Sequence, residues 1–174
     1  PYLGGDEVNS SPTNQHRRYV INFGEKSQEE CQSTWPSVFS HLEKKVKPER
    51  ISKSKEVAKY PWWLHLRPRS DLYSLIKDKE RVLVSTRHQL IWEICFVSSK
   101  QVFSDALVIF NYQEDIYLGL LQSQIHEIWA NFFGSTMGSA DALRYTPSNC
   151  FETFPMPNSF ISYERGLKIE DHFL

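Results

Sequence analysis

Three apolar segments rich in β-branched and aromatic residues follow one another between residues 81 and 112: RVLVST, QLIWEICFV and DALVIFNY. Short polar breaks, residues 86–89 (TRHQ) and 98–104 (SSKQVFS), separate them. Runs of this composition and length are typical of strands, and short connections between sequential strands favour antiparallel pairing. The sequence therefore predicts a small antiparallel sheet at the centre of the fold.

Helix-forming patterns precede these strands. Ser27 is followed three residues later by Glu30, a capping-box pattern that predicts the start of a helix. Pro36 suits the first turn of a second helix over residues 36–47 (PSVFSHLEKKVK), whose apolar residues recur at helical spacing and leave the lysines outward. We expect Pro48 to end or bend this helix.

Residues 117–133 (YLGLLQSQIHEIWANFF) carry the clearest helical period of the chain. The sequence predicts one continuous helix here, with an apolar stripe that packs against the sheet. Six side chains fall within an arc of about 100° and form this stripe: Leu118, Leu121, Ile125, Ile128, Trp129 and Phe132.

Three further segments complete the expected architecture. Residues 17–24 (RRYVINFG) alternate and are predicted to form a strand, and Asp71 is expected to cap a short helix over residues 72–79. Residues 134–149 are rich in Gly, Ser and Thr and are predicted to form a long irregular loop, which inside a compact domain is usually functional. Because helices and strands are segregated rather than strictly alternating, the predicted class is α+β, with a small, mostly antiparallel, twisted sheet and flanking helices.

The charge of the 174-residue chain is uneven, although its formal net value is only −1. Residues 41–70 contain nine Lys and Arg and three Glu, a net of +6, so the remainder carries −7. A positive face is therefore compatible with a neutral total, although a solvated helical face would give the same run. No apolar run approaches the ~18 residues that a membrane span needs.

The three cysteines are odd in number and far apart: Cys31, Cys95 and Cys150. This pattern argues against a disulfide framework or a zinc knuckle and fits a reducing cytoplasm.

Motif searches point away from catalysis in this segment. HEIWA (residues 126–130) begins like the zinc-protease motif H-E-x-x-H but has Ala130 at the position of the second histidine, so we interpret His126 as a packed or capping residue. We find no nucleophile elbow, phosphate-binding glycine loop, nuclease carboxylate pair or base-gripping motif of an adenine methyltransferase. We therefore predict no catalytic residue and no metal site in this chain.

The segment 60–69 (YPWWLHLRPR) combines two tryptophans with alternating basic residues. Adjacent residues of an extended chain face opposite sides, so at least one of Trp62 and Trp63 is predicted to lie in the core. His65, Arg67 and Arg69 would share a face, and arginine can hold phosphates bidentately. With other basic residues they give a set of phosphate-contact candidates: Lys47, Arg50, Arg67, Arg69 and Lys100.

Binding is the function that remains, and the residues alone leave two classes of partner open. Polar residues in the expected turns, 86–89 (TRHQ), 98–101 (SSKQ) and 134–145 (GSTMGSADALRY), could read base edges in the major groove of DNA. The alternative is a protein-interaction or dimerisation module that uses its aromatic residues. A near-neutral net charge favours this alternative, because free-standing nucleic-acid binders are usually more basic.

Ordered landmarks along residues 1–157 resemble a known family. They are PYLGGDEVNS, RRYVINFG, VKPER, WWLHLRPR, LQSQIHEIWA, GSTM and RYTPSNCFETFPMP. In this order they resemble the DNA target-recognition domain of MmeI-like (type IIL/IIG) restriction-modification enzymes. The resemblance implies an α+β fold related to the recognition domains of N6-adenine DNA methyltransferases. It also implies that residues 1–157 form this domain and that residues 158–174 begin a C-terminal tail or a linker.

The resemblance implies a role as well as a fold. In that family the recognition domain lies in the major groove of double-stranded DNA and its loops choose the bases. By position, residues 135–144 are the first candidates here and residues 85–89 the second. The base-reading candidates are Arg87, His88, Gln89, Ser135, Thr136, Asp141 and Arg144.

The family also implies what surrounds this segment. The chain would be a non-catalytic, cytoplasmic part of a larger phage-defence enzyme, next to a methyltransferase domain of the same polypeptide, with no cofactor of its own. The parent enzyme would use S-adenosylmethionine to methylate N6 of adenine, and Mg²⁺ if it also cleaves DNA.

Overall fold

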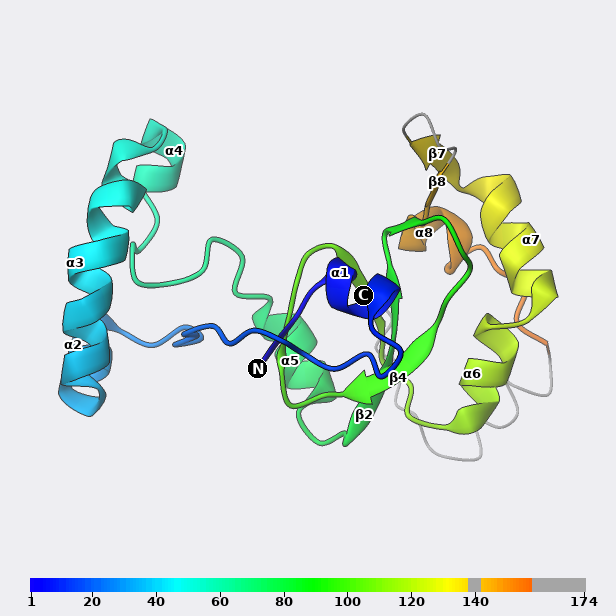
Figure 1. Cartoon of the computed structure of the whole chain (residues 1–174), viewed down its shortest axis with the longest axis horizontal. Coiled ribbons are helices and arrows are strands. Elements are labelled where there is room, and N and C mark those ends of the chain that lie inside the picture. Colours follow the sequence, from blue (N-terminus) through cyan, green and yellow to red (C-terminus); the bar gives the residue numbers. More distant parts are fainter. Residues whose placement is uncertain (138–141, 158–174) are drawn as a thin grey trace.

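The computed structural model describes residues 1–137 and 142–157, which form a helical lobe and a sheet-centred body (Figure 1). The helical lobe contains α2 (Gln28–Thr34), α3 (Pro36–Ser52) and α4 (Lys55–Ala58). The helices of the body are α1 (Gly5–Ser10), α5 (Ser70–Ile76), α6 (Asp115–Leu121), α7 (Gln124–Phe133) and α8 (Pro147–Cys150). Its strands are β1 (Tyr2–Leu3), β2 (Arg81–Thr86), β3 (His88–Gln89), β4 (Cys95–Ser98), β5 (Val102–Phe103), β6 (Leu107–Phe110), β7 (Ser135–Met137) and β8 (Ala142–Arg144).

Strand β2 lies at the centre of the body, between β4 and β6. Both pairings are antiparallel, so that Val84 lies opposite Cys95 on one side and Ile109 on the other. Two smaller sheets flank this one in the described part of the chain: parallel β1–β5 and antiparallel β3–β8–β7. The predicted α+β class with small, mostly antiparallel sheets and flanking helices is confirmed.

Apolar side chains cover both faces of the central sheet. Leu83 belongs to a cluster with Tyr117, Leu121 and Tyr145, which come from α6 and from the chain after β8. Side chains at alternate strand positions point to opposite faces. Val82 and Val84 accordingly belong to a second cluster, whose other members come from β1, α1, α5, β4, β5 and β6: Leu3, Val8, Ile76, Val97, Phe103 and Leu107.

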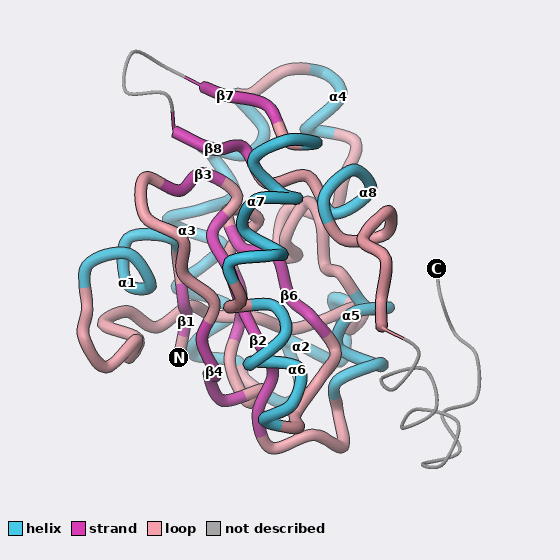
Figure 2. Tube along the Cα trace, turned by 90° about the vertical axis from the view of Figure 1, so that its right-hand side faces the viewer, coloured by secondary structure: helices cyan, strands magenta, loops and turns pink. Residues whose placement is uncertain are grey.

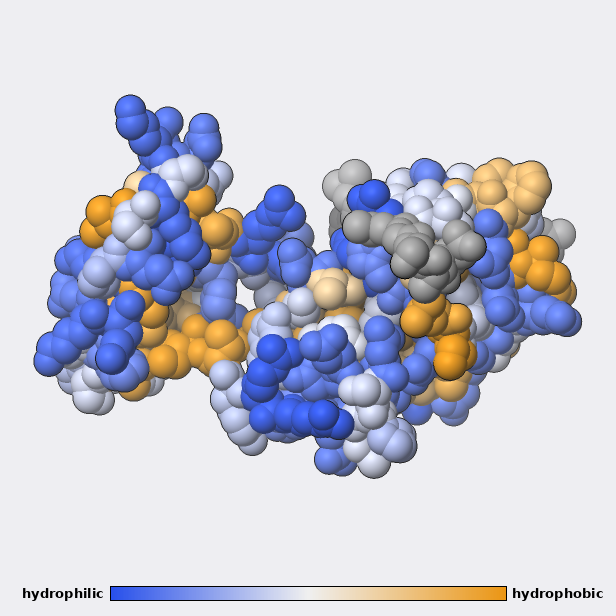
Figure 3. All heavy atoms as spheres, turned by 45° about the horizontal axis from the view of Figure 1, so that its top comes forward, coloured by the Kyte–Doolittle hydropathy of each residue, from blue (hydrophilic) through white to orange (hydrophobic). Residues whose placement is uncertain are grey.

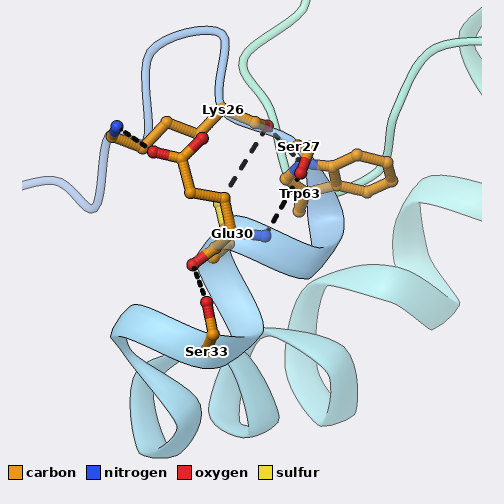
Figure 4. Close-up of polar contacts among 6 residues, drawn as sticks. Lys26, Ser27, Glu30, Ser33 and Trp63 are labelled. Atoms are coloured by element: carbon orange, nitrogen blue, oxygen red, sulfur yellow. Dashed lines mark hydrogen bonds and ion pairs between the residues drawn. The ribbon is translucent and has the colours of Figure 1, made fainter.

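The helical lobe has a third apolar cluster, built on Phe23, Cys31 and Phe39. The sequence predicts that at least one of Trp62 and Trp63 lies in the core, and both are in fact half-buried and pack against this cluster. Figure 4 shows the indole of Trp63 at the start of α2, where its Nε1 donates to the carbonyl of Lys26 at 3.1 Å. The tryptophans therefore attach the chain that leaves the lobe to the chain that enters it.

The N-terminus of α2 confirms the cap predicted at Ser27. The Ser27 hydroxyl accepts a hydrogen bond from the backbone N–H of Glu30 at 3.2 Å (Figure 4). The Glu30 carboxylate pairs with the amine of Lys26 instead of returning to the Ser27 backbone. Half of the expected capping box is therefore present.

The predicted helix over residues 117–133 is instead two helices, and its predicted stripe is wrong for its second half. Ser123 caps α7 by accepting from the N–H of His126, so the helical phase restarts there. Leu118 and Leu121 pack into the core as expected, but Ile125, Ile128 and Phe132 are 71%, 62% and 78% exposed. The buried face of α7 is formed by His126 and Ala130.

Local geometry overrides four other predictions. Residues 17–24 form no strand but only one isolated bridge, between Arg18 and Tyr2. Of the two outcomes predicted at Pro48, an end or a bend, the end is wrong, because α3 continues through Pro48 to Ser52. The predicted strand over residues 89–97 is interrupted. Only its two ends belong to strands, Gln89 to β3 and residues 95–97 to β4, and the residues between them form no strand. Residues 134–149 are not an irregular loop, because β7, β8 and α8 occupy most of their described part.

The start of α5 also differs from the prediction. Its N-cap is Arg69, which adopts a left-handed conformation with φ of 54°, and Asp71 lies inside the first turn instead of capping it. Within residues 1–137 and 142–157, no helix is long and apolar enough to cross a membrane.

Gly134, between α7 and β7, provides a test of how tightly the β7–β8 hairpin is packed. A Cβ at this position would lie 2.5 Å from the carbonyl oxygen of Ala130 and 2.6 Å from Cδ1 of Leu143. Because one of these atoms belongs to the backbone, we expect Gly134→Ala to lower the free energy of unfolding by about 1–3 kcal/mol, measured by urea titration. Gly119→Ala is the matched control, since a Cβ there meets nothing within 4 Å in a helix, and it should raise stability by about 0.5–1 kcal/mol. Equal effects of the two changes would contradict this packing.

Candidate nucleic-acid interface

A groove of about 720 Å³ separates the helical lobe from the body, and Figure 3 shows the hollow between the two masses. Its walls come from the last turns of α3, from residues 65–69 and from residues 102–105. Five cations and two carboxylates line it, a net of +3: Arg50, Lys53, Arg67, Arg69 and Arg87 against Glu49 and Asp105. His65 also lines this groove. The structure therefore brings together three of the five phosphate-contact candidates.

Three of the groove arginines are fixed to backbone carbonyls. Arg50 donates to Leu64 O at 2.9 Å, Arg69 to Ser104 O at 3.3 Å, and Arg87 through Nε to Asp105 O at 2.7 Å. A guanidinium carries five N–H donors, so each retains donors for a partner in the groove. Burial lowers the pKa of Arg69, yet an arginine remains charged at any physiological pH. The groove is thus a preorganised set of cationic donors.

The remaining groove cations differ in their attachment. Arg67 is exposed and makes no hydrogen bond or ion pair with the described residues. Lys53 pairs with Glu49 at 3.1 Å, one helical turn away on α3. The sequence reasoning missed Lys53, although its spacing of three residues from Arg50 places both on one side of a helix.

Two predicted phosphate contacts lie outside this groove lining. Lys47 pairs with Glu43 at 2.8 Å and stands 5.2 Å from the ring centre of Trp62, so it packs on the helical lobe. Lys100 is exposed in the turn between β4 and β5. Neither contributes to the charge of the groove.

The β3–β8–β7 sheet lies at one end of the body (Figure 2). A row of exposed polar side chains crosses this sheet. His88 lies opposite Arg144, which lies opposite Ser135 on its other side. Residues directly opposite one another in a ladder share a face. All three are exposed, so three predicted base-reading residues form a continuous row that was not apparent from their separation in sequence. Thr136 is also exposed on β7, but it lies opposite Leu143 in the ladder, so its side chain points to the other face from this row.

Two other base-reading candidates do not join the row. Gln89 is only 4% exposed, and both ends of its amide are engaged, with Nε2 donating to Ser85 Oγ and Oε1 accepting from the Glu93 N–H. Its amide therefore holds the chain between β2 and β4 and is not available to a base. Asp141 lies outside the described residues.

Arg87 joins the groove to the row. Its guanidinium lines the groove, while the next residue, His88, belongs to the exposed row. The backbone N–H of Arg87 donates to Ala106 O, and the carbonyl of Arg87 accepts from the N–H of Tyr145, both at 2.8 Å. The cationic groove and the polar row are therefore adjacent along the chain at residues 87 and 88, and backbone hydrogen bonds fix this point of the chain.

Tyr145 and His126 anchor β8 to α7. His126 is fully buried, with Nδ1 3.0 Å from Leu121 O and Nε2 3.2 Å from the Tyr145 hydroxyl. Burial lowers the pKa of His126 and raises that of Tyr145, so the neutral ring donates from Nδ1 and accepts the tyrosine proton at Nε2. This confirms the interpretation of His126 as a packed residue.

Among the described residues, no three or more His, Cys, Asp or Glu side chains lie close enough together to hold a metal ion. The cysteines are free, with Cys31 and Cys150 buried, and burial raises the pKa of Cys95 to about 12.

Comparisons with known proteins concern the family and the fold of the chain. A family model described as "MmeI, target recognition domain" matches residues 1–158. A solved structure of the type IIL restriction-modification enzyme MmeI in complex with DNA matches with a TM-score of 0.64 and 20% identity, over 93% of this chain and 21% of that chain. At this identity the likeness shows a shared fold, and the chain spans about a fifth of the length of that enzyme. No curated protein sequence matches the chain.

The buried His126 gives the anchor of β8 a defined pH dependence. Its pKa lies below the ordinary value of 6.5, so its contribution to stability is complete above pH 6.5 and is lost as the pH falls below that value. We expect His126→Gln to be less stable than the wild type at pH 7.5, and the difference in free energy of unfolding to narrow towards pH 5. Urea titrations of both proteins at each pH measure this difference, and a gap that stays constant would contradict a neutral buried imidazole.

Proposed function

This chain belongs to the MmeI target recognition domain family, and from that premise we propose that it reads the sequence of double-stranded DNA for a larger restriction-modification enzyme. The observation that carries the proposal is a cationic groove and an exposed polar row that are adjacent along the chain at Arg87 and His88. Contacts to phosphates position a protein on DNA, whereas contacts to base edges specify the sequence. The groove and the row match these two tasks.

The groove supplies the contacts that do not depend on sequence. Arg50, Arg67, Arg69 and Arg87 can neutralise phosphates, and each neutralised phosphate releases counterions. Helices α6 and α7 carry no Lys or Arg and two carboxylates, Asp115, which pairs with Arg81 at 2.9 Å, and Glu127. A duplex is therefore attracted to the groove side and not to α6 and α7.

The row across β3, β8 and β7 supplies the base contacts. The Arg144 guanidinium can donate two hydrogen bonds to O6 and N7 of a guanine. His88 and Ser135 flank it and can read the neighbouring base edges. Thr136 and Asp141 remain base-reading candidates in this proposal. Lys47 and Lys100 remain phosphate-contact candidates outside the groove.

The parent enzyme in this proposal is an N6-adenine DNA methyltransferase that also has a nuclease. S-adenosylmethionine, and Mg²⁺ for cleavage, would be held by the other domains of that polypeptide. The recognition domain would then hold the duplex from one side while the methyltransferase domain acts on the adenine.

A protein-interaction module is the second candidate, and one observation favours it. Ile125, Ile128 and Phe132 expose an apolar face on α7, and Figure 3 shows apolar residues at the right-hand end of the molecule, where α7 lies. This face and the groove lie on different parts of the surface. Measurement of DNA binding separates the two functions. A DNA-reading domain should bind duplexes with a steep salt dependence, whereas a protein-interaction module should not bind them in this way.

The groove gives a prediction about affinity. Arg67→Ala should weaken binding to all duplexes alike and reduce the slope of log K against log salt by roughly one phosphate contact, or ~0.9. The control is Lys77→Ala, an exposed lysine beyond the end of α5 that does not line the groove. Fluorescence anisotropy with a labelled duplex at several salt concentrations measures both effects. A change in base preference without a change in slope would contradict the assignment.

The row gives a prediction about specificity. Selection of bound duplexes from a random library should yield a discrete motif for the wild type, and Arg144→Ala should relax one position of it by about 1–3 kcal/mol. The salt slope should stay unchanged, because the altered contact is to a base. In the parent enzyme, mapping of N6-methyladenine should show the same relaxed position. Failure of the wild-type chain to enrich any motif would overturn the proposed function.

A further inference from the structure

The end of α1 reaches the same surface, although it is far from the row in sequence. Asn9, in the last turn of α1, is exposed, and its side-chain oxygen accepts from the hydroxyl of Thr86 at 3.0 Å. The same hydroxyl lies 3.1 Å from the carbonyl oxygen of His88. Thr86 itself is only 3% exposed. A buried hydroxyl thus connects Asn9 to the first residue of the exposed row, and Figure 2 shows α1 on the same side of the body as β3.

The Thr86 hydroxyl holds the Asn9 amide at this surface, and its single proton is shared between the Asn9 side-chain oxygen and the His88 carbonyl oxygen. In this arrangement the Nδ2 group of Asn9 makes no hydrogen bond with any described residue. A carbonyl oxygen has two lone pairs, so Oδ1 can accept a second bond. Asn9 therefore presents a donor and an acceptor side by side on an exposed edge.

Attachment of α1 does not depend on Asn9. Glu7 is 4% exposed and forms a two-pronged ion pair with Arg18 at 2.7 and 2.9 Å, which lowers the pKa of this carboxyl. Val8 is buried in the core cluster beneath the sheet. The residues before Asn9 thus hold α1 against the body. The hydrogen bond between Asn9 and Thr86 at the exposed end of the helix adds little to this packing.

We propose that Asn9 reads an adenine in the major groove, with Nδ2 donating to N7 and Oδ1 accepting from the N6 amino group, and that Thr86 is the residue that positions it. An asparagine amide matches this edge of adenine bidentately. The inference rests on the proposed function and adds a base-reading residue from α1, about 80 residues before β3 in the chain.

Selection of bound duplexes with four variants of the chain tests this assignment. Asn9→Ala should lose the preference for adenine at one position of the motif by roughly 5- to 150-fold, with the salt slope unchanged. Asn9→Asp keeps an acceptor for the Thr86 hydroxyl but removes the amine, so the preference at that position should move towards cytosine, whose N4 donates. Thr86→Val should weaken the same position, whereas Thr86→Ser, which retains the hydroxyl, should preserve it.

Each outcome bears on the proposal. If the wild type enriches a motif and all Asn9 variants enrich it unchanged at every position, Asn9 is no base reader, while the proposed function stands. If Asn9→Ala weakens all positions equally, its role is general and the assignment is wrong. If the wild type enriches no motif, both proposals fail. Circular dichroism and urea titration of the Thr86 variants separate loss of reading from loss of folding.

Discussion

Burial of β2 on both faces is the constraint on which the rest of the structure depends. Residues 82–86 are all buried, so two apolar layers must form, one from α6, α7 and α8 and the other from β1, α1 and α5. The last two residues of the strand are polar, and their hydroxyls find partners in the chain that follows: Ser85 binds Glu93 O and Gln89, and Thr86 binds Asn9 and His88 O. The strand therefore ends by organising the surface that we assign to DNA.

The near-neutral charge of the chain conceals a strong local asymmetry. Five cations gather around one groove, whereas α6 and α7 carry only acidic charges. Net charge governs solubility and long-range attraction, but a local field directs a duplex to one face. The near-zero net charge, which favoured a protein partner, is thus the sum of a positively charged groove and of other parts of the surface that carry negative charge.

The sequence predicted features that depend on a few neighbouring residues, such as strands, helix caps and burial. It did not predict contacts between segments that are distant in the chain. Composition predicted β2 and β6, and Ser27 and the tryptophan pair were identified correctly because capping and burial act over a few residues. The stripe on residues 117–133 failed because one hydroxyl, that of Ser123, restarts the helix and changes its phase. Gln89 looked available because its partners, Ser85 and Glu93, meet it only after the chain folds back, and the pairing of His88 with Arg144 joins residues far apart in sequence.

The position of the helical lobe within the chain has a consequence for folding and for variation. Strand β1 pairs with β5, joining Tyr2 to Val102, and the whole lobe lies in the loop that this pairing closes. The cost of closing a flexible loop grows only with the logarithm of its length, about 0.6 kcal/mol for each doubling. Because the lobe has its own apolar cluster, we expect changes in its length to cost the sheet body little stability. We therefore expect the wall of the groove that α3 forms to tolerate insertions and deletions better than the wall that the sheet body forms.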